Sequence, residues 1–327
     1  MLAGHKMVSA GRRTGGVAVD SPIAFVLGGG GVRGAVEIGM IKALFEAGIR
    51  PDVITGTSIG AINGALVAHD PSAGVVDTLL HAWTSAEANA VYGDSVRMQV
   101  WRLFKTKTHL NSPAPLQRIL ERSLGIDATF EELAVPLRVV AASIERAAEQ
   151  VFDSGALIPA VLASASVPGL LPATRIGDEH YIDGGVVNSI PIDHALAAGA
   201  RTVFVLQVGR VETPLVAPTS AVGAARVAFE IARRHRFARD LATLPAGVTL
   251  HILPSGGSLE GDESLMAFRR MDTVHRRIGQ AYEASSAFLR DRALSGAPVE
   301  TTAPVETPAP VEATAPEETT APEKGSR

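Results

Sequence analysis

The chain alternates short, mainly apolar runs with segments in which apolar residues recur at helical spacing. An apolar run bounded by glycine or proline is typical of a strand buried on both faces. Because helical segments follow nearly every run, the pattern predicts an α/β fold with a mostly parallel central sheet covered by helices. The strands are expected at residues 24–27, 53–55, 137–143, 180–182, 202–208 and 248–253.

Helical spacing is clearest after the first run. Ile38, Ile41 and Leu44 recur on one face before Gly48, which is placed to end the helix. Residues 73–125 are expected to be mainly helical, with joints at Gly93-Asp94 and at 111–113. Other helices are expected over 61–69, 156–164, 191–198, the arginine-rich stretch 226–239, and from about Asp262 past Arg290.

Two of these helices have more than one interpretation. Residues 96–104 mix Trp101 and Phe104 with basic residues, and the pattern favours a helix packed in the core. A lipid-facing flap over the site is the alternative. The arginine-rich helix is expected to present a solvated face, and attraction of anionic lipid headgroups is its alternative.

Composition divides the chain into three parts. Residues 1–20 have no hydrophobic period and are expected to be a flexible leader, followed by one folded domain over 21–295. Residues 296–327 are a Thr/Ala/Pro/Glu tract that repeats Ala-Pro-Val-Glu and lacks large apolar side chains. Such a segment cannot bury enough surface to offset its chain entropy, so we expect a disordered tail.

Charge and cysteine content narrow the class of protein. The net charge is −4, and the acidic tail accounts for it, so nothing favours nucleic-acid binding. Cysteine is absent, which excludes disulfides and thiolate chemistry. No secretory signal and no apolar run of membrane-spanning length are found, so we expect a cytoplasmic protein, with peripheral membrane contact left open.

A glycine-rich corner follows the first strand, with the spacing Gly29-x-Gly31-x-x-Gly34. Dinucleotide-binding folds use the same spacing, but their second strand ends in an acidic residue, and here it ends in Gly56-Thr57-Ser58. The other interpretation is an oxyanion hole, in which backbone N–H groups stabilise a developing negative charge. Its candidate residues are Gly29, Gly30, Gly31, Val32, Arg33 and Gly34, with Arg33 either adding positive charge or bracing the loop.

The second strand leads into Gly56-Thr57-Ser58-Ile59-Gly60, which fits the Gly-x-Ser-x-Gly nucleophile elbow. In such an elbow a sharp strand-to-helix turn exposes the serine, and Gly56 and Gly60 remove side chains that would block the turn. Ser58 is therefore the candidate nucleophile, and it needs a base.

Two kinds of base are available. A serine triad would use a late histidine, yet none of His194, His235, His251 and His275 stands at a glycine-rich corner after a strand. Asp183 does, in Asp183-Gly184-Gly185. An aspartate has an ordinary pKa near 4, so burial would have to raise it for this role. A plain tight turn is the alternative interpretation of the corner.

The three motifs, in this order, resemble those of the patatin-like phospholipase family, as does the stretch 163–169 ahead of Asp183. The resemblance covers roughly residues 21–210. It implies a three-layer α/β/α sandwich and a Ser–Asp dyad with Ser58 as nucleophile and Asp183 as general base. It also implies an oxyanion hole from residues 29–34, with Gly184 and Gly185 at the dyad corner.

The activity implied by the resemblance is hydrolysis of lipid acyl esters without a cofactor or metal. The lipid class and the oligomeric state stay open. Two rivals are kept: a serine esterase with a histidine triad, and a non-catalytic module that binds a nucleotide or lipid.

Overall fold

The computed structural model describes residues 12–14, 17–85, 88, 91, 96–208, 214–256 and 271–295. Four sequence-based expectations fall outside these residues: most of the leader, the joint at Gly93-Asp94, the start of the last helix near Asp262, and the tail from 296. Within the leader, β1 (Arg12–Thr14) and β2 (Val17–Val19) pair antiparallel, which the sequence did not predict.

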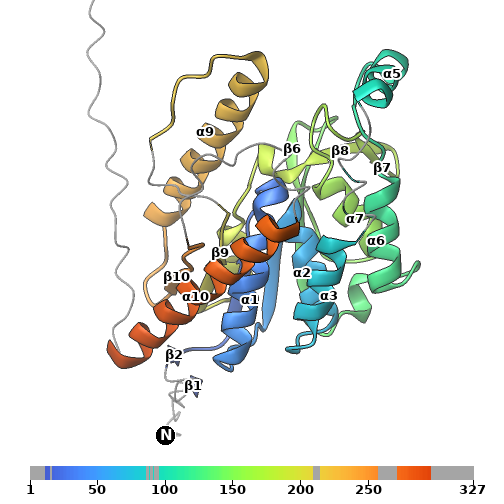
Figure 1. Ribbon diagram of the computed structural model, residues 1–327. Coiled ribbons are helices and arrows are strands. Elements are labelled where there is room, and N and C mark those ends of the chain that lie inside the picture. The colour runs from blue at the N-terminus through green and yellow to red at the C-terminus, as the bar shows by residue number, and fades with distance from the viewer. Residues whose placement is uncertain are drawn as a thin grey trace, which may run out of the picture.

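An eight-stranded sheet forms the centre of the molecule, in the order β10-β9-β3-β4-β5-β8-β7, with β6 paired to β5 (Figure 1). From β10 to β5 every pairing is parallel, and the pairings of β6, β7 and β8 are antiparallel. The strands are β3 (Ile23–Leu27), β4 (Val53–Thr57), β5 (Leu137–Ser143), β6 (Ala148–Phe152), β7 (Thr174–Ile176), β8 (Glu179–Asp183), β9 (Thr202–Leu206) and β10 (Thr249–Ile252).

Alternate residues of the central strands point into two separate cores. In β3, Phe25 and Leu27 join the larger core, whereas Ala24 and Val26 join the smaller one on the opposite face. The larger core is covered by α1 (Val36–Glu46), α2 (Ile59–His69), α3 (Val75–Thr84), α6 (Ala114–Leu124), α7 (Leu157–Ser164) and α10 (Met271–Ser295). The smaller core is covered by α8 (Ile192–Ala197) and α9 (Ala221–Ala242). The structure therefore confirms the expected α/β/α sandwich with a mostly parallel sheet.

Strand register places two strand ends next to each other along β5. Thr57, the last residue of β4, pairs with Val140, and Asp183, the last residue of β8, pairs with the next residue, Ala141. Because β6 occupies the other edge of β5 over 139–143, β4 and β8 lie end to end on the same edge. The chain following β4 and the last residue of β8 are thus brought to one point.

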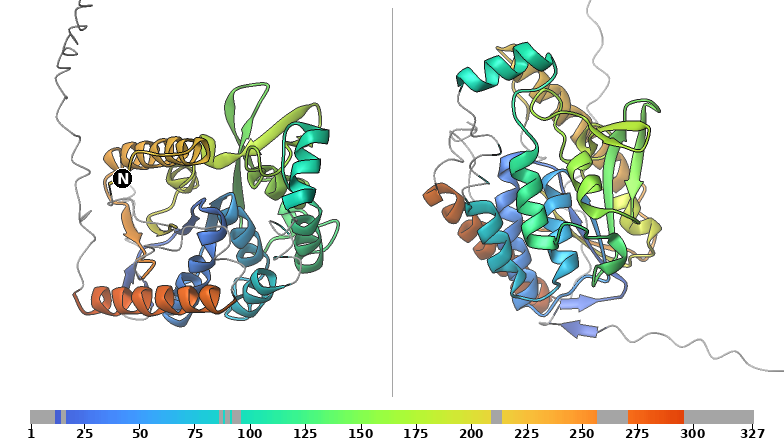
Figure 2. Two further views of the ribbon diagram at one scale, coloured as in Figure 1. Left: turned by 45° about the horizontal axis from the view of Figure 1, so that its top comes forward. Right: turned by 90° about the vertical axis from the view of Figure 1, so that its right-hand side faces the viewer.

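The helix α5 (Val96–Thr106) corrects one expectation. It does not pack in the core: Trp101 is 55% and Phe104 85% exposed. Figure 1 shows α5 standing off the end of the body at which β3 and β4 finish, and both views of Figure 2 place it at the periphery. Hydrophobic periodicity predicted the helix but could not tell which of its faces meets the protein.

The crossing of α1 and α10 depends on close approach at Gly39. A Cβ at this position would lie 2.2 Å from the carbonyl oxygen of Ile278 and 2.7 Å from the backbone nitrogen of Tyr282. Gly39→Ala should therefore push the two helices apart and lower the free energy of unfolding by about 1–3 kcal/mol.

Gly279→Ala, on the facing helix, is the matched control, because a Cβ there would meet no atom within 4 Å. It should raise the free energy of unfolding by up to about 1 kcal/mol, since alanine favours a helix over glycine. Urea unfolding of both variants measures this, and equal effects would contradict the packing argument.

Candidate active site

Ser58 sits at the turn between β4 and α2 with the backbone angles φ 56° and ψ −120°. This is a strained conformation for a residue with a side chain. The turn is possible because backbone approaches backbone at both flanking glycines. A Cβ on Gly56 would lie 2.5 Å from the Gly60 carbonyl oxygen, and one on Gly60 would lie 2.2 Å from that of Leu27. The local geometry is that of a nucleophile elbow.

Asp183 meets Ser58 directly. The Ser58 hydroxyl donates a hydrogen bond of 2.5 Å to Asp183 Oδ2, and the Gly185 N–H donates one of 2.8 Å to Oδ1. Gly184 and Gly185 begin the short helix η3 (Gly184–Val186) and carry the chain away from β8. The structure thus brings together the serine and the aspartate that the sequence singled out, from strand ends 125 residues apart.

Asp183 is only 1% exposed. Burial raises the pKa of its carboxyl group from an ordinary 3.8 to about 6, although the hydrogen bonds from Ser58 and Gly185 favour the charged form. The carboxylate is therefore ionised at neutral pH and a stronger base than an ordinary aspartate. Desolvation supplies what the sequence argument required of a base at this position.

The glycine-rich loop lies beside Ser58, and a Cβ on Gly29 would be 3.6 Å from the Cβ of Ser58. Its N–H groups have different tasks. The Gly29 N–H donates to the carbonyl of Ser189 (2.8 Å), so this group holds the loop in place. Within the described part of the chain, the N–H groups of Gly30 and Gly31 bond to no backbone carbonyl.

The rest of the loop turns into the short helix η1 (Gly31–Ala35), which contains Val32, Arg33 and Gly34. Arg33 is half-buried there, and Gly34 is buried, facing Ile59 beside the nucleophile. The assignment of these residues to an oxyanion hole stays a prediction. Within it, Gly30 and Gly31 are better placed to donate than Gly29.

A buried polar chain supports the loop from behind. The Asn63 amide donates to the Gly34 carbonyl (3.2 Å) and to Glu37 Oε2 (2.7 Å), and the Trp83 indole N–H donates to Asn63 Oδ1 (3.0 Å). Burial raises the pKa of Glu37 well above its ordinary value. Sequence reasoning did not find these residues, because their hydrogen bonds join elements that are far apart in the chain, and no local pattern reveals such bonds.

Two serines in the stretch 163–169 connect the two halves of the dyad. The Ser164 hydroxyl accepts the Ser58 N–H (2.8 Å) and donates to the Val140 carbonyl (2.5 Å). The Ser166 carbonyl accepts the Asp183 N–H (2.9 Å). The sequence marked this stretch only by its resemblance to a family segment, and the structure shows that it holds the backbone of both Ser58 and Asp183.

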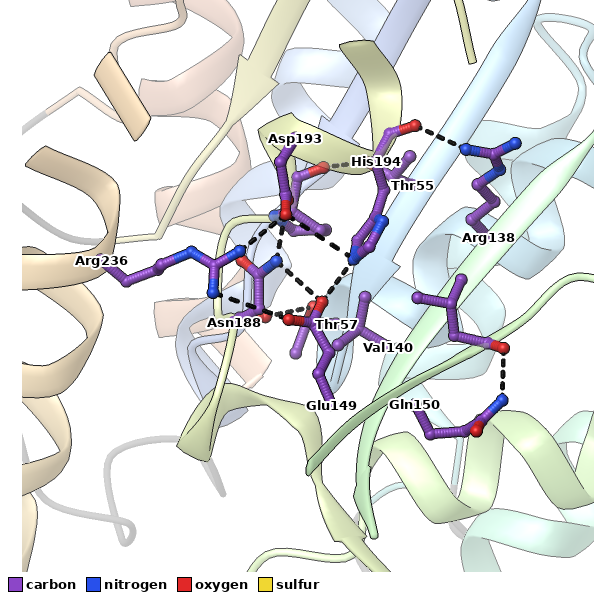
Figure 3. Close-up of polar contacts among 12 residues, drawn as sticks. Thr55, Thr57, Arg138, Val140, Glu149, Gln150, Asn188, Asp193, His194 and Arg236 are labelled. Atoms are coloured by element: carbon purple, nitrogen blue, oxygen red, sulfur yellow. Dashed lines mark hydrogen bonds and ion pairs between the residues drawn. The ribbon is translucent and has the colours of Figure 1, made fainter. Parts of the chain in front are cut away.

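A polar cluster, which Figure 3 shows, surrounds Asn188 in the chain that follows Asp183. Asn188 accepts the Thr57 hydroxyl at its carbonyl (2.8 Å), and its side-chain amide donates to Glu149 (3.0 Å) and Asp193 (2.9 Å). Because Thr57 precedes the nucleophile, the cluster ties the two strand ends together from the opposite face.

Glu149, Asp193 and His194 also have the donor atoms of a metal site, all within 4.8 Å of one another. However, the guanidinium of Arg236 lies 2.6 Å from Asp193 and 3.6 Å from Glu149, and His194 bonds to Glu149. The guanidinium of Arg236 thus already occupies a position between the two carboxylates as their shared cation. We assign the cluster to anchoring the turn.

The late histidines lie elsewhere. His194 bonds to Glu149, and His251 stacks on Phe204, where burial lowers its pKa to about 4. His235 and His275 are exposed residues of α9 and α10. None of the four has a hydrogen bond to Ser58 or Asp183 among the contacts described for this part of the chain.

Comparison with known proteins identifies the family of the chain. The family profile described as "Patatin-like phospholipase" matches residues 25–196, which contain all three motifs. The chain belongs to the patatin-like phospholipase family. Among curated patatin-like relatives, patatin-like phospholipase domain-containing protein 6 of Mus musculus is 36% identical over 195 residues, 59% of this chain and 14% of that protein. Lysophospholipase nte1 of Aspergillus niger is 31% identical over 212 residues, 62% of this chain and 13% of that protein.

The chain thus spans about one seventh of the length of the curated patatin-like relatives it matches. Among solved structures, that of VipD from Legionella pneumophila has a TM-score of 0.43 and 14% identity, covering 84% of this chain and 68% of that one. Within the described residues of this patatin-like chain, no helix is both long and apolar enough to cross a membrane.

The raised pKa of Asp183 predicts how stability depends on pH in this patatin-like fold. The folded protein holds the Asp183 proton more tightly than the unfolded chain, so the stabilisation is present below about pH 3.8 and is lost as pH rises through about 6. Asp183→Asn does not titrate. The free energy of unfolding of the variant, relative to that of the wild type, should therefore rise by roughly 2 kcal/mol between pH 4 and pH 7.

Urea unfolding across this range measures the difference, and the comparison at pH 4, where both side chains are neutral in the folded state, is its internal reference. A difference that does not change with pH would mean that the Asp183 carboxyl group is not desolvated.

Proposed function

We propose that the chain is a serine lipid acyl hydrolase that uses Ser58 as nucleophile and Asp183 as general base. The observation that carries the proposal is the 2.5 Å hydrogen bond from Ser58 to a buried carboxylate whose pKa is about 6. The strained backbone of Ser58 supports it, because it presents the hydroxyl at the start of α2, where the positive end of the helix dipole favours a developing anion.

In the first half-reaction, Asp183 takes the proton of Ser58 as the serine oxygen attacks the carbonyl carbon of the lipid ester. The negative charge passes to the carbonyl oxygen, which the N–H groups of Gly30 and Gly31 stabilise. The tetrahedral intermediate then collapses, the ester bond breaks, and the leaving alcohol takes the proton from Asp183. An acyl-serine remains.

In the second half-reaction, Asp183 takes a proton from water, which attacks the acyl-serine. The bond to Ser58 breaks, the serine oxygen recovers the proton from Asp183, and the fatty acid leaves. The same carboxylate serves as base and then acid in both halves. The proposed chemistry therefore uses one serine, one aspartate and backbone donors.

The substrate class follows from the family, and a relative's name gives the first compound to test. The name lysophospholipase describes a protein that is 31% identical to this chain. We therefore expect a lysophospholipid to be hydrolysed, and a panel of phospholipids and neutral glycerides, with product identification by mass spectrometry, would define the range.

Removing either member of the dyad should abolish hydrolysis. Ser58→Ala removes the nucleophile and Asp183→Asn removes the base, and each should lower kcat by about three orders of magnitude or more. Hydrolysis of lysophospholipid by purified variants, with circular dichroism to verify folding, measures this. Near-normal activity in either variant would refute the dyad.

Single His→Gln substitutions at the four late histidines are the matched controls. The His235, His251 and His275 variants should keep most of the activity, because none of these side chains is proposed to act on the substrate. His194→Gln removes one bond of the anchoring cluster, so it should lower activity only in part. Collapse of activity on one substitution, with the fold intact, would instead favour a histidine triad. Failure of a phosphonate probe to label Ser58 would favour the non-catalytic binding module.

The proposed base also predicts the pH dependence of the rate. Asp183 must be deprotonated to accept the serine proton, so kcat/KM should rise with pH and level off above about 6, the pKa of its carboxyl group. The profile is measured between pH 4.5 and pH 8 with a soluble short-chain ester. Carboxyl ionisation releases little heat, so the midpoint should barely move with temperature, whereas a midpoint that falls on warming would indicate a histidine.

A further inference from the structure

The amphipathic helix α5 exposes large apolar side chains and is attached to the protein by polar ones. Its half-buried polar residues attach it to the body of the protein: Gln99 donates to Asn111 (3.1 Å), and Arg102 donates to the Leu110 carbonyl (2.9 Å). Thr106, one turn further on, bonds to the carbonyl of Arg102 (2.9 Å). A helix of a globular protein normally places its apolar stripe on the core. Here polar side chains attach the helix instead.

Four large apolar side chains of α5 are exposed. Phe104 is 85% exposed, Trp101 55%, Met98 44% and Leu103 43%. Large apolar residues grouped on one exposed surface mark a site of interaction with something apolar. Scattered exposed residues occur elsewhere on the described chain, but nowhere else do four belong to one helix.

Charge identifies the kind of partner. Residues 96–110 contain Arg97, Arg102, Lys105 and Lys107 and no acidic residue, although the whole chain has a net charge of −4. The ammonium group of Lys105 lies 5.1 Å from the centre of the Trp101 ring, so an aromatic side chain and a cation share one surface. Tryptophan and phenylalanine combined with basic residues are typical of helices that lie in the headgroup region of an anionic bilayer.

The position of α5 relates this surface to the dyad. The loop that follows α5 bonds to the segment behind the site, with Leu110 donating to the Gly169 carbonyl (3.1 Å) and Asn111 donating to that of Leu170 (2.9 Å). This segment begins with Ser164 and Ser166, which bond to the backbone N–H groups of the two dyad residues. The helix is therefore connected to the part of the chain that positions the reacting groups.

The arginine-rich helix α9 is a poorer lipid surface. Arg233 and Arg234 both bond to Glu230, and Arg236 bonds to Asp193 and Asp240. Much of its positive charge is compensated within the protein. Of the two lipid-binding alternatives raised by the sequence, the contacts favour the one at α5.

We propose that α5 docks the protein on an anionic lipid bilayer. The helix lies along the membrane surface with Trp101 and Phe104 among the acyl chains and the exposed basic residues Arg97 and Lys105 among the headgroups. This surface goes beyond the hydrolase proposed above, because it requires no turnover.

Vesicle binding tests the surface independently of catalysis, because all variants are made in the 327-residue chain that carries Ser58→Ala. Sedimentation is measured with phosphatidylcholine vesicles, with and without 30% phosphatidylglycerol. Binding to the anionic vesicles should fall about tenfold for each of Trp101→Ser and Phe104→Ser, because each removes a large apolar side chain from the bilayer. Lys105→Glu should weaken binding to anionic vesicles only.

Ile126→Ser is the matched control, because the Ile126 side chain is 76% exposed but lies away from α5. Ile126 follows the C-terminal end of α6, whereas α5 precedes its N-terminal end. It should bind like its parent. Circular dichroism verifies that each variant is folded.

Fluorescence gives a second measurement, since the chain contains only two tryptophans, Trp83 and Trp101. In Trp83→Phe, the emission of Trp101 should shift to the blue with anionic vesicles and be quenched by brominated lipids. If Trp83→Phe does not fold, the difference between the parent and Trp101→Phe reports the same signal.

Three results would overturn the proposal. The parent protein does not bind anionic vesicles; the α5 variants bind as well as Ile126→Ser; or the parent is a dimer in ultracentrifugation that Phe104→Ser converts to a monomer without changing vesicle binding. The last result would assign the apolar surface to a second copy of the chain.

Discussion

The candidate site depends on the meeting of two strand ends along one edge of β5. The parallel strand β4 stops at Thr57, the antiparallel strand β8 arrives from the other direction and stops at Asp183, and their partners on β5 are adjacent residues. This register brings the serine after β4 and the aspartate of β8 to within one hydrogen bond. It also places the carboxylate inside the sheet layer, where solvation is lost. The distance and the raised pKa thus have the same structural cause, and a shift of β8 by one residue would point Asp183 to the other face of the sheet.

Burying a charged base and a glycine-rich loop together requires that the surrounding polar groups be partnered. Ser164 and Ser166 bond to the backbone N–H groups of Ser58 and Asp183, so that neither residue can move without breaking a bond to the same short segment. The Asn188 cluster holds the two strand ends from the opposite face, and Asn63 holds the glycine-rich loop. Because the Gly29 N–H is used to fix this loop, the donors left for a substrate are those farther along it. In the proposed mechanism, positioning and stabilisation of the oxyanion are therefore divided between neighbouring N–H groups of the same loop.

The sequence predicted those features of the fold and site that depend on residues close together in the chain. Runs such as residues 24–27 are apolar on both faces, so the central strands and the two-sided covering by helices followed directly. The elbow at Ser58 and the corner at Asp183 were found because a tight turn requires glycine at fixed offsets. The antiparallel edge was missed, since β6 contains Glu149 and Gln150 and has no apolar run. Ser164, Asn63 and Asn188 were missed for another reason: their partners are far away in the chain, and no local pattern distinguishes them from ordinary polar residues.

The orientation of α5 lies between these cases, because the sequence predicted the helix and left its surroundings open. Periodicity reports that a helix has an apolar side, but the side that meets the protein is decided by competition between burial and polar attachment. In α5 the loop after the helix offers Asn111 and the Leu110 carbonyl to Gln99 and Arg102, and these bonds hold the polar side inward. Exposing Trp101 and Phe104 to water is unfavourable. A sequence that keeps them there is consistent with an environment other than water at that surface, and a lipid bilayer would supply it.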